Sequence, residues 1–185
     1  MTEIADRLPP KLASFVRLLL KVEGAIISLF TLIMGLTFFV VVVLRYGLNA
    51  DLFAYEEWLL IICFWLYLLA SSVGTYHDVH VNADILSYAI KNKRLAWIRR
   101  LVVNVIEIVV TAVLVYWSIL MIADELSFYP ALEATNALRI PLLVPRLAMP
   151  VGFGLMLFYS SLHLYVLLKL GPEGDLETDP GPELV

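Results

Sequence analysis

The sequence predicts an all-α integral membrane protein with four transmembrane helices. Apolar residues make up 61% of the 185 residues, and the mean hydropathy is +0.87, whereas a soluble domain is roughly 45–50% apolar. A helix needs about 20 apolar residues to cross the hydrocarbon core of a bilayer. Apolar runs of about that length predict spans at 22–44, 58–76, 101–123 and 147–170. Together they form one transmembrane domain over residues 22–170.

Residues 1–21 precede the first span and predict a short amphipathic helix that lies in the membrane interface. Pro9 and Pro10 are typical of a chain that enters a helix. After them, apolar residues recur at helical spacing with basic residues between them, among them Lys11, Arg17 and Lys21. The alternative is that this segment simply extends the first span.

Small residues form stripes on the first two spans. Gly24, Ser28, Thr31 and Gly35 fall on one face of the first helix. Ala70 and Gly74 form a similar pair on the second span. Such stripes let another helix backbone approach closely. We therefore expect helix docking at these faces, either within this chain or with a partner.

The connection between the second and third spans predicts a short amphipathic segment at 83–90, followed by several basic residues. The third span carries Glu107, which shares a face with Asn104 and Thr111. An ionisable group inside a span is costly unless it is paired or reached by water. We expect Glu107 to face protein or a water-filled recess.

The linker 124–146 contains three prolines, and we expect it to fold against the outer membrane surface. After the fourth span, residues 171–185 are acidic and rich in Gly and Pro. This composition predicts a disordered, solvated cytoplasmic tail.

The distribution of Lys and Arg predicts the orientation in the membrane. Ten of the 13 lie in the N-terminal segment, the 76–100 connection and the tail, and three lie in the two opposite connections. Basic residues concentrate on the cytoplasmic side. Both termini are therefore expected to be cytoplasmic.

Arg45 ends the first span and Glu57 begins the second. Antiparallel neighbouring helices would bring the two side chains together, and an arginine–carboxylate pair fixes orientation. We interpret them as a structural ion pair. The alternative is a set of solvated loop charges, each worth little.

Histidines and acids at the end of the second span raise the question of a metal. His77, Asp78, His80 and Asp84 have residue types and spacings that can bind zinc or iron. His163 could also pair with His77 or His80 as axial ligands of one haem b. Such residues are common at a helix exit, however, where they hydrogen-bond to the backbone. We favour the helix exit, with no metal and no cofactor.

Several classes of function lack their usual sequence signal. The chain has no Gly-rich phosphate loop, no basic stripe for nucleic acid and no grouping of catalytic residues. Cys63 is the single cysteine, so it says nothing of the redox compartment. We expect a protein that is not an enzyme and does not bind nucleic acid.

Four motifs in order carry a family resemblance over about residues 18–170: LRY at 44–46, EEW at 56–58, HVNAD at 80–84 and LRIPLLVPRLAMPVGFGLML at 138–157. The chain resembles the small membrane subunit (Q, or DctQ-type) of tripartite ATP-independent periplasmic (TRAP) transporters. It departs from the pattern at Ala70, where the family often has Gly, and at Tyr76, where it often has a basic residue.

The resemblance implies a multi-pass protein of the bacterial inner membrane that does no chemistry. Its partners would be membrane lipid, the large membrane subunit (M, or DctM-type) and a periplasmic substrate-binding protein. The chain would scaffold the large subunit for sodium-driven uptake of an organic acid. Carried over by motif, Arg45, Glu57, His80 and Asp84 are expected to have structural or interface roles, and we expect the same of Glu107. The alternatives are a four-helix membrane cytochrome with one haem b and the small subunit of a tricarboxylate-type transporter.

Overall fold

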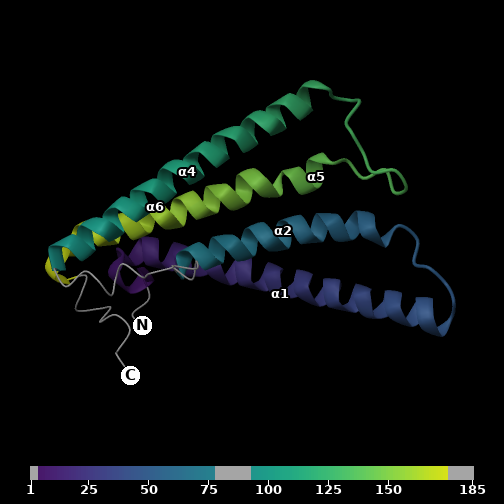
Figure 1. The fold of residues 1–185 in the computed structure, drawn as a ribbon, viewed down its shortest axis with the longest axis horizontal. Coiled ribbons are helices and arrows are strands. Elements are labelled where there is room, and N and C mark those ends of the chain that lie inside the picture. The colour runs from purple at the N-terminus through teal and green to yellow at the C-terminus, as the bar shows by residue number, and fades with distance from the viewer. Residues whose placement is uncertain (1–3, 78–92, 175–185) are drawn as a thin grey trace.

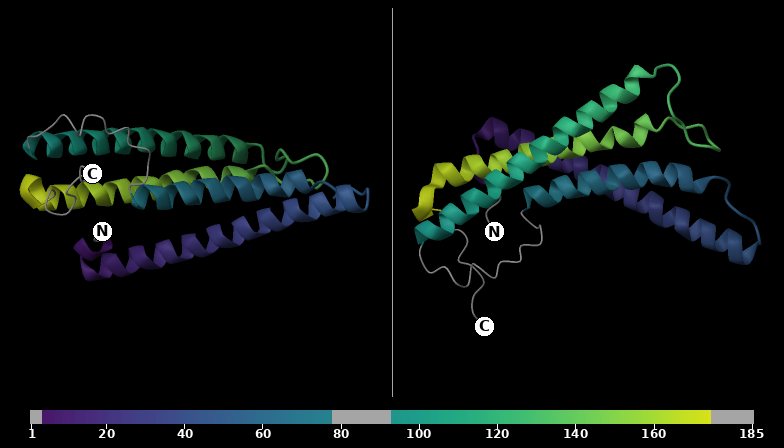
Figure 2. Two further views of the ribbon diagram at one scale, coloured as in Figure 1. Left: turned by 60° about the horizontal axis from the view of Figure 1, so that its bottom comes forward. Right: turned by 45° about the horizontal axis from the view of Figure 1, so that its top comes forward.

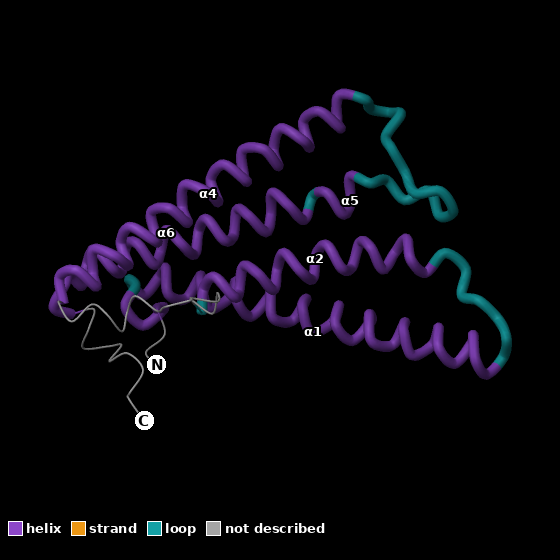
Figure 3. Tube along the Cα trace, in the orientation of Figure 1, coloured by secondary structure: helices purple, strands orange, loops and turns teal. Residues whose placement is uncertain are grey.

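The computed structural model describes residues 4–77 and 93–174. This part of the chain is helical apart from its connections, and it contains no strand (Figure 3). Its elements are a 3-10 turn η1 (Ile4–Arg7), the long helices α1 (Pro10–Gly47), α2 (Tyr55–Tyr76) and α4 (Lys93–Ser127), the single turn α5 (Leu143–Arg146), and α6 (Ala148–Gly174). The predicted segment at 83–90 and the tail from residue 175 lie outside the described residues.

Four of these helices are long and apolar enough to cross a membrane, as the sequence predicts. They are α1, α2, α4 and α6 with the preceding α5. Many large apolar side chains on α1 and α4 are exposed, which suits helices that meet lipid or another membrane protein.

α1 runs without a break across the boundary predicted between residues 21 and 22. The structure therefore has the alternative, in which the N-terminal segment extends the first span, and not a separate N-terminal helix. Pro10 stands in its first turn, where proline is tolerated because the first N–H groups of a helix have no intrahelical partner. At 38 residues, α1 is roughly 57 Å long.

The helices lie in the spatial order α4, α6, α2, α1 (Figure 1). α6 packs between α4 and α2, and α1 packs on the far side of α2. Helix α1 is inclined to the other three (Figure 2). We call the end where α1 begins and α6 finishes the termini end, and the opposite end, where α1 and α4 finish, the loop end. α1 and α4 diverge toward the loop end (Figure 1).

The best-packed region lies at the termini end. Its buried core joins η1, α1, α2 and α6 through Leu8, Ala13, Val16, Tyr76, Tyr159, Leu162 and Val166. Lys169 near the end of α6 donates to the backbone carbonyl of Arg7 over 3.3 Å. The turn η1 that precedes α1 is thus hydrogen-bonded to the end of α6, although 162 positions of sequence separate the two residues.

Candidate functional site: a polar layer across four helices

Glu23 lies at the junction of α1, α2 and α6 and is only 2% exposed. The Ser72 hydroxyl lies 2.7 Å from Glu23 Oε2, and the Tyr159 hydroxyl donates to Oε1 over 2.7 Å. Both partners are fully buried. A buried carboxylate is tolerated when hydrogen bonds satisfy its oxygens. This contact therefore ties three helices together through one side chain.

Tyr76 extends this contact to η1. Its ring meets the Tyr159 ring edge to face, with centroids 5.4 Å apart, a favoured aromatic geometry. Its hydroxyl accepts a hydrogen bond from the backbone N–H of Ala5 over 3.3 Å. The turn that precedes α1 is thereby fixed to the end of α2.

Ser160, the next residue of α6, makes the matching contact with α4. Its hydroxyl donates to Glu107 Oε1 over 2.8 Å. Consecutive helical residues point about 100° apart, so Tyr159 and Ser160 reach different neighbours at the same level. We call Glu23, Ser72, Glu107, Tyr159 and Ser160 the polar layer. It contains at least one residue from each long helix, and Glu107 faces protein as expected.

His163 lies one turn further along α6. Its Nε2 is 3.0 Å from the carbonyl oxygen of Thr75 and 3.1 Å from that of Tyr76. A carbonyl oxygen only accepts, so Nε2 carries the hydrogen. The imidazole therefore donates to backbone carbonyls in the last turn of α2. The carbonyls of a last turn have no N–H partner within their own helix.

The helices α2 and α6 approach closely at Gly152. A Cβ atom at this position would lie 2.6 Å from the Cβ of Leu68, closer than two carbons can approach. By contrast, a Cβ at Gly154 would meet nothing within 4 Å. Gly152 is thus the small residue that permits this internal contact.

The predicted small-residue stripe on α1 does not serve packing inside this chain. Nothing lies within 4 Å of a Cβ built at Gly24 or Gly35. Ser28 and Thr31 are exposed and donate to the carbonyls of Gly24 and Ile27 in their own helix. The stripe therefore faces away from α2.

At the loop end, Glu57 binds the linker rather than Arg45. Its two carboxylate oxygens accept hydrogen bonds from the backbone N–H groups of Ala137 and Leu138, each over 2.7 Å. Arg45 is exposed at the end of α1, and the described residues contain no ion pair between it and Glu57. The predicted clasp between the first two spans is wrong. The Glu57 carboxylate instead reaches backbone N–H groups of the linker, and such groups need a hydrogen-bond acceptor.

A clasp that the sequence reasoning missed joins α5, α4 and the linker. Arg146 lies 3.1 Å from Glu125 Oε2 and donates to Glu133 Oε2 over 3.0 Å. The Glu125 side chain is only 5% exposed, and that of Glu133 is 70% exposed. The arginine is thus the countercharge of a buried acid.

The linker itself folds into a tight turn. Thr135 donates its N–H to the carbonyl of Ile140, and the N–H of Leu142 donates to that of Glu133, each over 2.9 Å. The hydroxyl of Thr135 also accepts from the N–H of Ile140 over 3.0 Å. Glu57 and Arg146 therefore hold a formed turn against the ends of α2 and α4.

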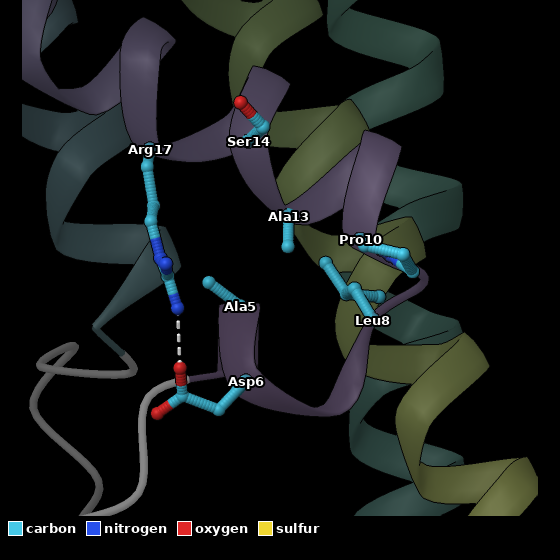
Figure 4. A pocket seen from close by; sticks show the side chains of 7 residues that line it. All are labelled: Ala5, Asp6, Leu8, Pro10, Ala13, Ser14 and Arg17. Carbon is cyan, nitrogen blue, oxygen red and sulfur yellow. Dashed lines mark hydrogen bonds and ion pairs between the residues drawn. The ribbon is translucent and has the colours of Figure 1, made fainter.

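A hollow of about 380 Å³ lies between η1 and the first turns of α1 (Figure 4). Arg17 reaches along its edge to form an ion pair with Asp6 of η1. The remaining lining is short and mostly apolar: Ala5, Leu8, Pro10, Ala13 and Ser14. The hollow therefore lies where the chain leaves η1 and enters α1, and the ion pair joins these two elements.

Two of the predicted site residues, His80 and Asp84, lie outside the described residues, as does Asp78 of the metal alternative. Within residues 4–77 and 93–174, no group of three or more His, Cys, Asp or Glu side chains is placed to hold a metal ion. His77 is exposed, and its ring packs edge to face against Tyr76 with centroids 5.0 Å apart.

One residue that the sequence reasoning missed, Glu23, had a usable signal. Glu23 is an acid that follows a basic residue and precedes a long apolar run, a position where a charge inside a membrane helix is costly. Its partners Ser72 and Tyr159 carry no such signal, because single hydroxyl groups are common in membrane helices. The arrangement as a whole fastens helices to one another: each of its polar contacts joins two or three elements.

A comparison with known protein families finds a match. The family model described as "Tripartite ATP-independent periplasmic transporters, DctQ component" matches residues 33–170. The match covers α2, α4, α5, most of α6 and the second part of α1 from residue 33. No curated protein matches the chain.

Proposed function

Because this chain belongs to the DctQ component family of tripartite ATP-independent periplasmic transporters, we propose that it is the non-catalytic small membrane subunit of such a transporter. In this role it scaffolds a large membrane subunit, of the DctM type, in the bacterial inner membrane. The assembly would take up an organic acid, delivered by a periplasmic binding protein and driven by sodium.

The observation that carries the scaffold role is the way the polar groups are used. Glu23 and Glu107 inside the bundle, and Glu57 and Arg146 at the loop end, are each bound by groups of this chain. Their hydrogen-bonding capacity fixes helices rather than a transported ion or acid. Such a bundle is suited to remain static while a partner moves.

The surface of α1 supports contact with a membrane partner. Its outward stripe of Gly24, Ser28, Thr31 and Gly35 meets nothing in this chain, and small residues of this kind favour close helix packing in membranes. The exposed face of α4 is instead built from bulky residues such as Val102, Val109 and Val113. We assign the α1 face to protein and the α4 face to lipid.

We further propose the orientation that the basic residues predict, with the termini end in the cytoplasm and the loop end in the periplasm. In that orientation Glu57 and the linker turn lie on the outer side. Arg45, His80 and Asp84 then have structural or interface roles at the two ends of the second span.

Co-expression with a DctM-type large subunit tests the function. With an affinity tag on this chain alone, we expect the two subunits to co-purify in a fixed ratio from detergent. The test variant is the tagged chain carrying Gly24→Leu and Gly35→Leu. These changes fill the stripe at two positions open to space and should lower recovery of the large subunit. Stable purification of the wild-type chain without any large subunit would contradict the proposal.

A further inference from the structure

The first three turns of α1 present three distinct faces. Ala13 and Val16 face the bundle and are buried. Phe15, Leu18 and Val22 are exposed apolar residues, each about half exposed or more. At about 100° per residue, Arg17 and Lys21 share a third face, whereas Lys11 falls at the N-terminal end of the apolar face, between Leu18 and Val22; all three are exposed.

α1 runs without a break through this segment, so it leaves the hydrocarbon core here, and long basic side chains near the end of a span reach the lipid headgroups. The length of α1 agrees. About 20 residues cross a hydrocarbon core of about 30 Å. Counted back from Arg45 in the last turn, they reach about residue 25. At 1.5 Å per residue, Lys21 and Arg17 then lie about 6 Å and about 12 Å beyond the core, within reach of lipid headgroups, and Lys11 lies further out.

The charge at this place is predominantly positive. Lys169 of α6 is exposed and reaches η1, the turn before α1, through the Arg7 carbonyl. Asp6 of η1 is paired with a single guanidinium nitrogen of Arg17. Since arginine has five N–H donors, the rest of its guanidinium remains available, as do the ammonium groups of Lys11 and Lys21.

We infer that the exposed basic side chains at the termini end, Lys11, Arg17, Lys21 and Lys169, bind the headgroups of anionic phospholipids and so anchor α1 there. Phosphate groups bind arginine and lysine through charge-assisted hydrogen bonds. An anionic lipid adds net negative charge that a zwitterionic lipid lacks, and each basic residue near such a surface contributes about 1 kcal/mol. The inference requires a membrane but no large subunit.

The test uses the full chain in nanodiscs of phosphatidylcholine with a minor share of phosphatidylglycerol. After mild extraction, mass spectrometry measures how strongly phosphatidylglycerol is enriched among the retained lipids. The test variant is Lys11→Gln with Lys21→Gln. The matched control is Arg45→Gln with Arg139→Gln, which removes the same charge from exposed positions at the loop end.

Wild type and control should enrich phosphatidylglycerol, and the test variant should lose at least about fivefold of that enrichment, the effect of one such residue at about 1 kcal/mol. Equal enrichment in the test variant and the wild type would overturn the inference, and so would an equal loss in the control. If the test variant does not fold, wild type is measured in increasing salt. Because salt screens exposed charges, enrichment that salt leaves unchanged also overturns it. Co-purification with the large subunit is a separate readout, so failure here is distinguishable from failure of the scaffold role.

Discussion

Tyr159 of α6 donates a hydrogen bond to Glu23 of α1 over 2.7 Å, across 136 positions of sequence. The same carboxylate is bound by Ser72 of α2. α1 otherwise packs mainly on α2, and this contact adds a polar tie to the centre of the bundle beside the apolar contacts of the buried core. It sets the position of a helix whose outer face we assign to the partner.

Replacement of Glu23 by Ala is expected to lower stability by about 1–3 kcal/mol, because Tyr159 loses its acceptor in a buried place, while Ser72 keeps the Leu69 carbonyl. Glu23→Gln keeps one carbonyl acceptor and should cost less. Thermal unfolding in detergent, followed by tryptophan fluorescence, measures both. The matched control is Glu56→Ala, an exposed acid on α2, which should leave the midpoint unchanged.

A double-mutant cycle of Glu23→Ala with Tyr159→Phe isolates the bond itself. Interhelical hydrogen bonds in membrane proteins couple by about 0.6 kcal/mol on average and up to about 1.7 kcal/mol. We expect a value in the upper part of this range, because both groups are buried. Strictly additive effects would show that the two side chains act independently.

Gly152→Ala is expected to destabilise the α2–α6 contact by about 1–3 kcal/mol, as overpacking does in well-packed interiors. The added Cβ would lie 2.6 Å from the Cβ of Leu68, which belongs to a helix and cannot rotate away. Gly154→Ala is the control, since its Cβ meets nothing within 4 Å. Equal unfolding midpoints for the two variants would contradict the close approach.

The architecture could be predicted from the sequence because hydropathy alone reports helices of membrane-spanning length. The four predicted spans correspond to the four long helices. Helix ends were less predictable: α1 begins at Pro10, not at residue 22, because the basic residues that end the apolar run do not interrupt the helix.

The contacts of the site could be predicted only in part. Glu107 was identified from its cost inside a span, and the same argument applied to Glu23 would have found it. The partner of Glu57 could not be found from the sequence. It consists of the backbone amides of residues 137 and 138, and every residue type except proline carries such an amide. Likewise, a stripe of small residues identifies a face, but Gly24 and Gly35 do not say which molecule covers it.

Glu57→Ala is expected to loosen the linker turn, because the N–H groups of Ala137 and Leu138 lose their acceptors. Limited trypsin digestion measures this through cleavage after Arg139, which is exposed within the same turn. We expect cleavage to become several times faster than in wild type. Glu56→Ala serves as control, and a Glu57 variant cleaved at the wild-type rate would show that the turn holds without it.

Arg146→Met is expected to be the most destabilising change at the loop end, because it leaves Glu125 buried without its cation. Removal of one partner of a buried ion pair typically costs 3–5 kcal/mol; the Arg146 side chain is 31% exposed, so we expect about 3 kcal/mol or less. Glu133→Ala should cost much less, since that side chain is mostly exposed. The double variant Arg146→Met with Glu125→Leu removes the buried charge and should recover most of the unfolding midpoint. If the double variant unfolds as early as Arg146→Met alone, the loss arises from packing around the arginine and not from the unpaired acid.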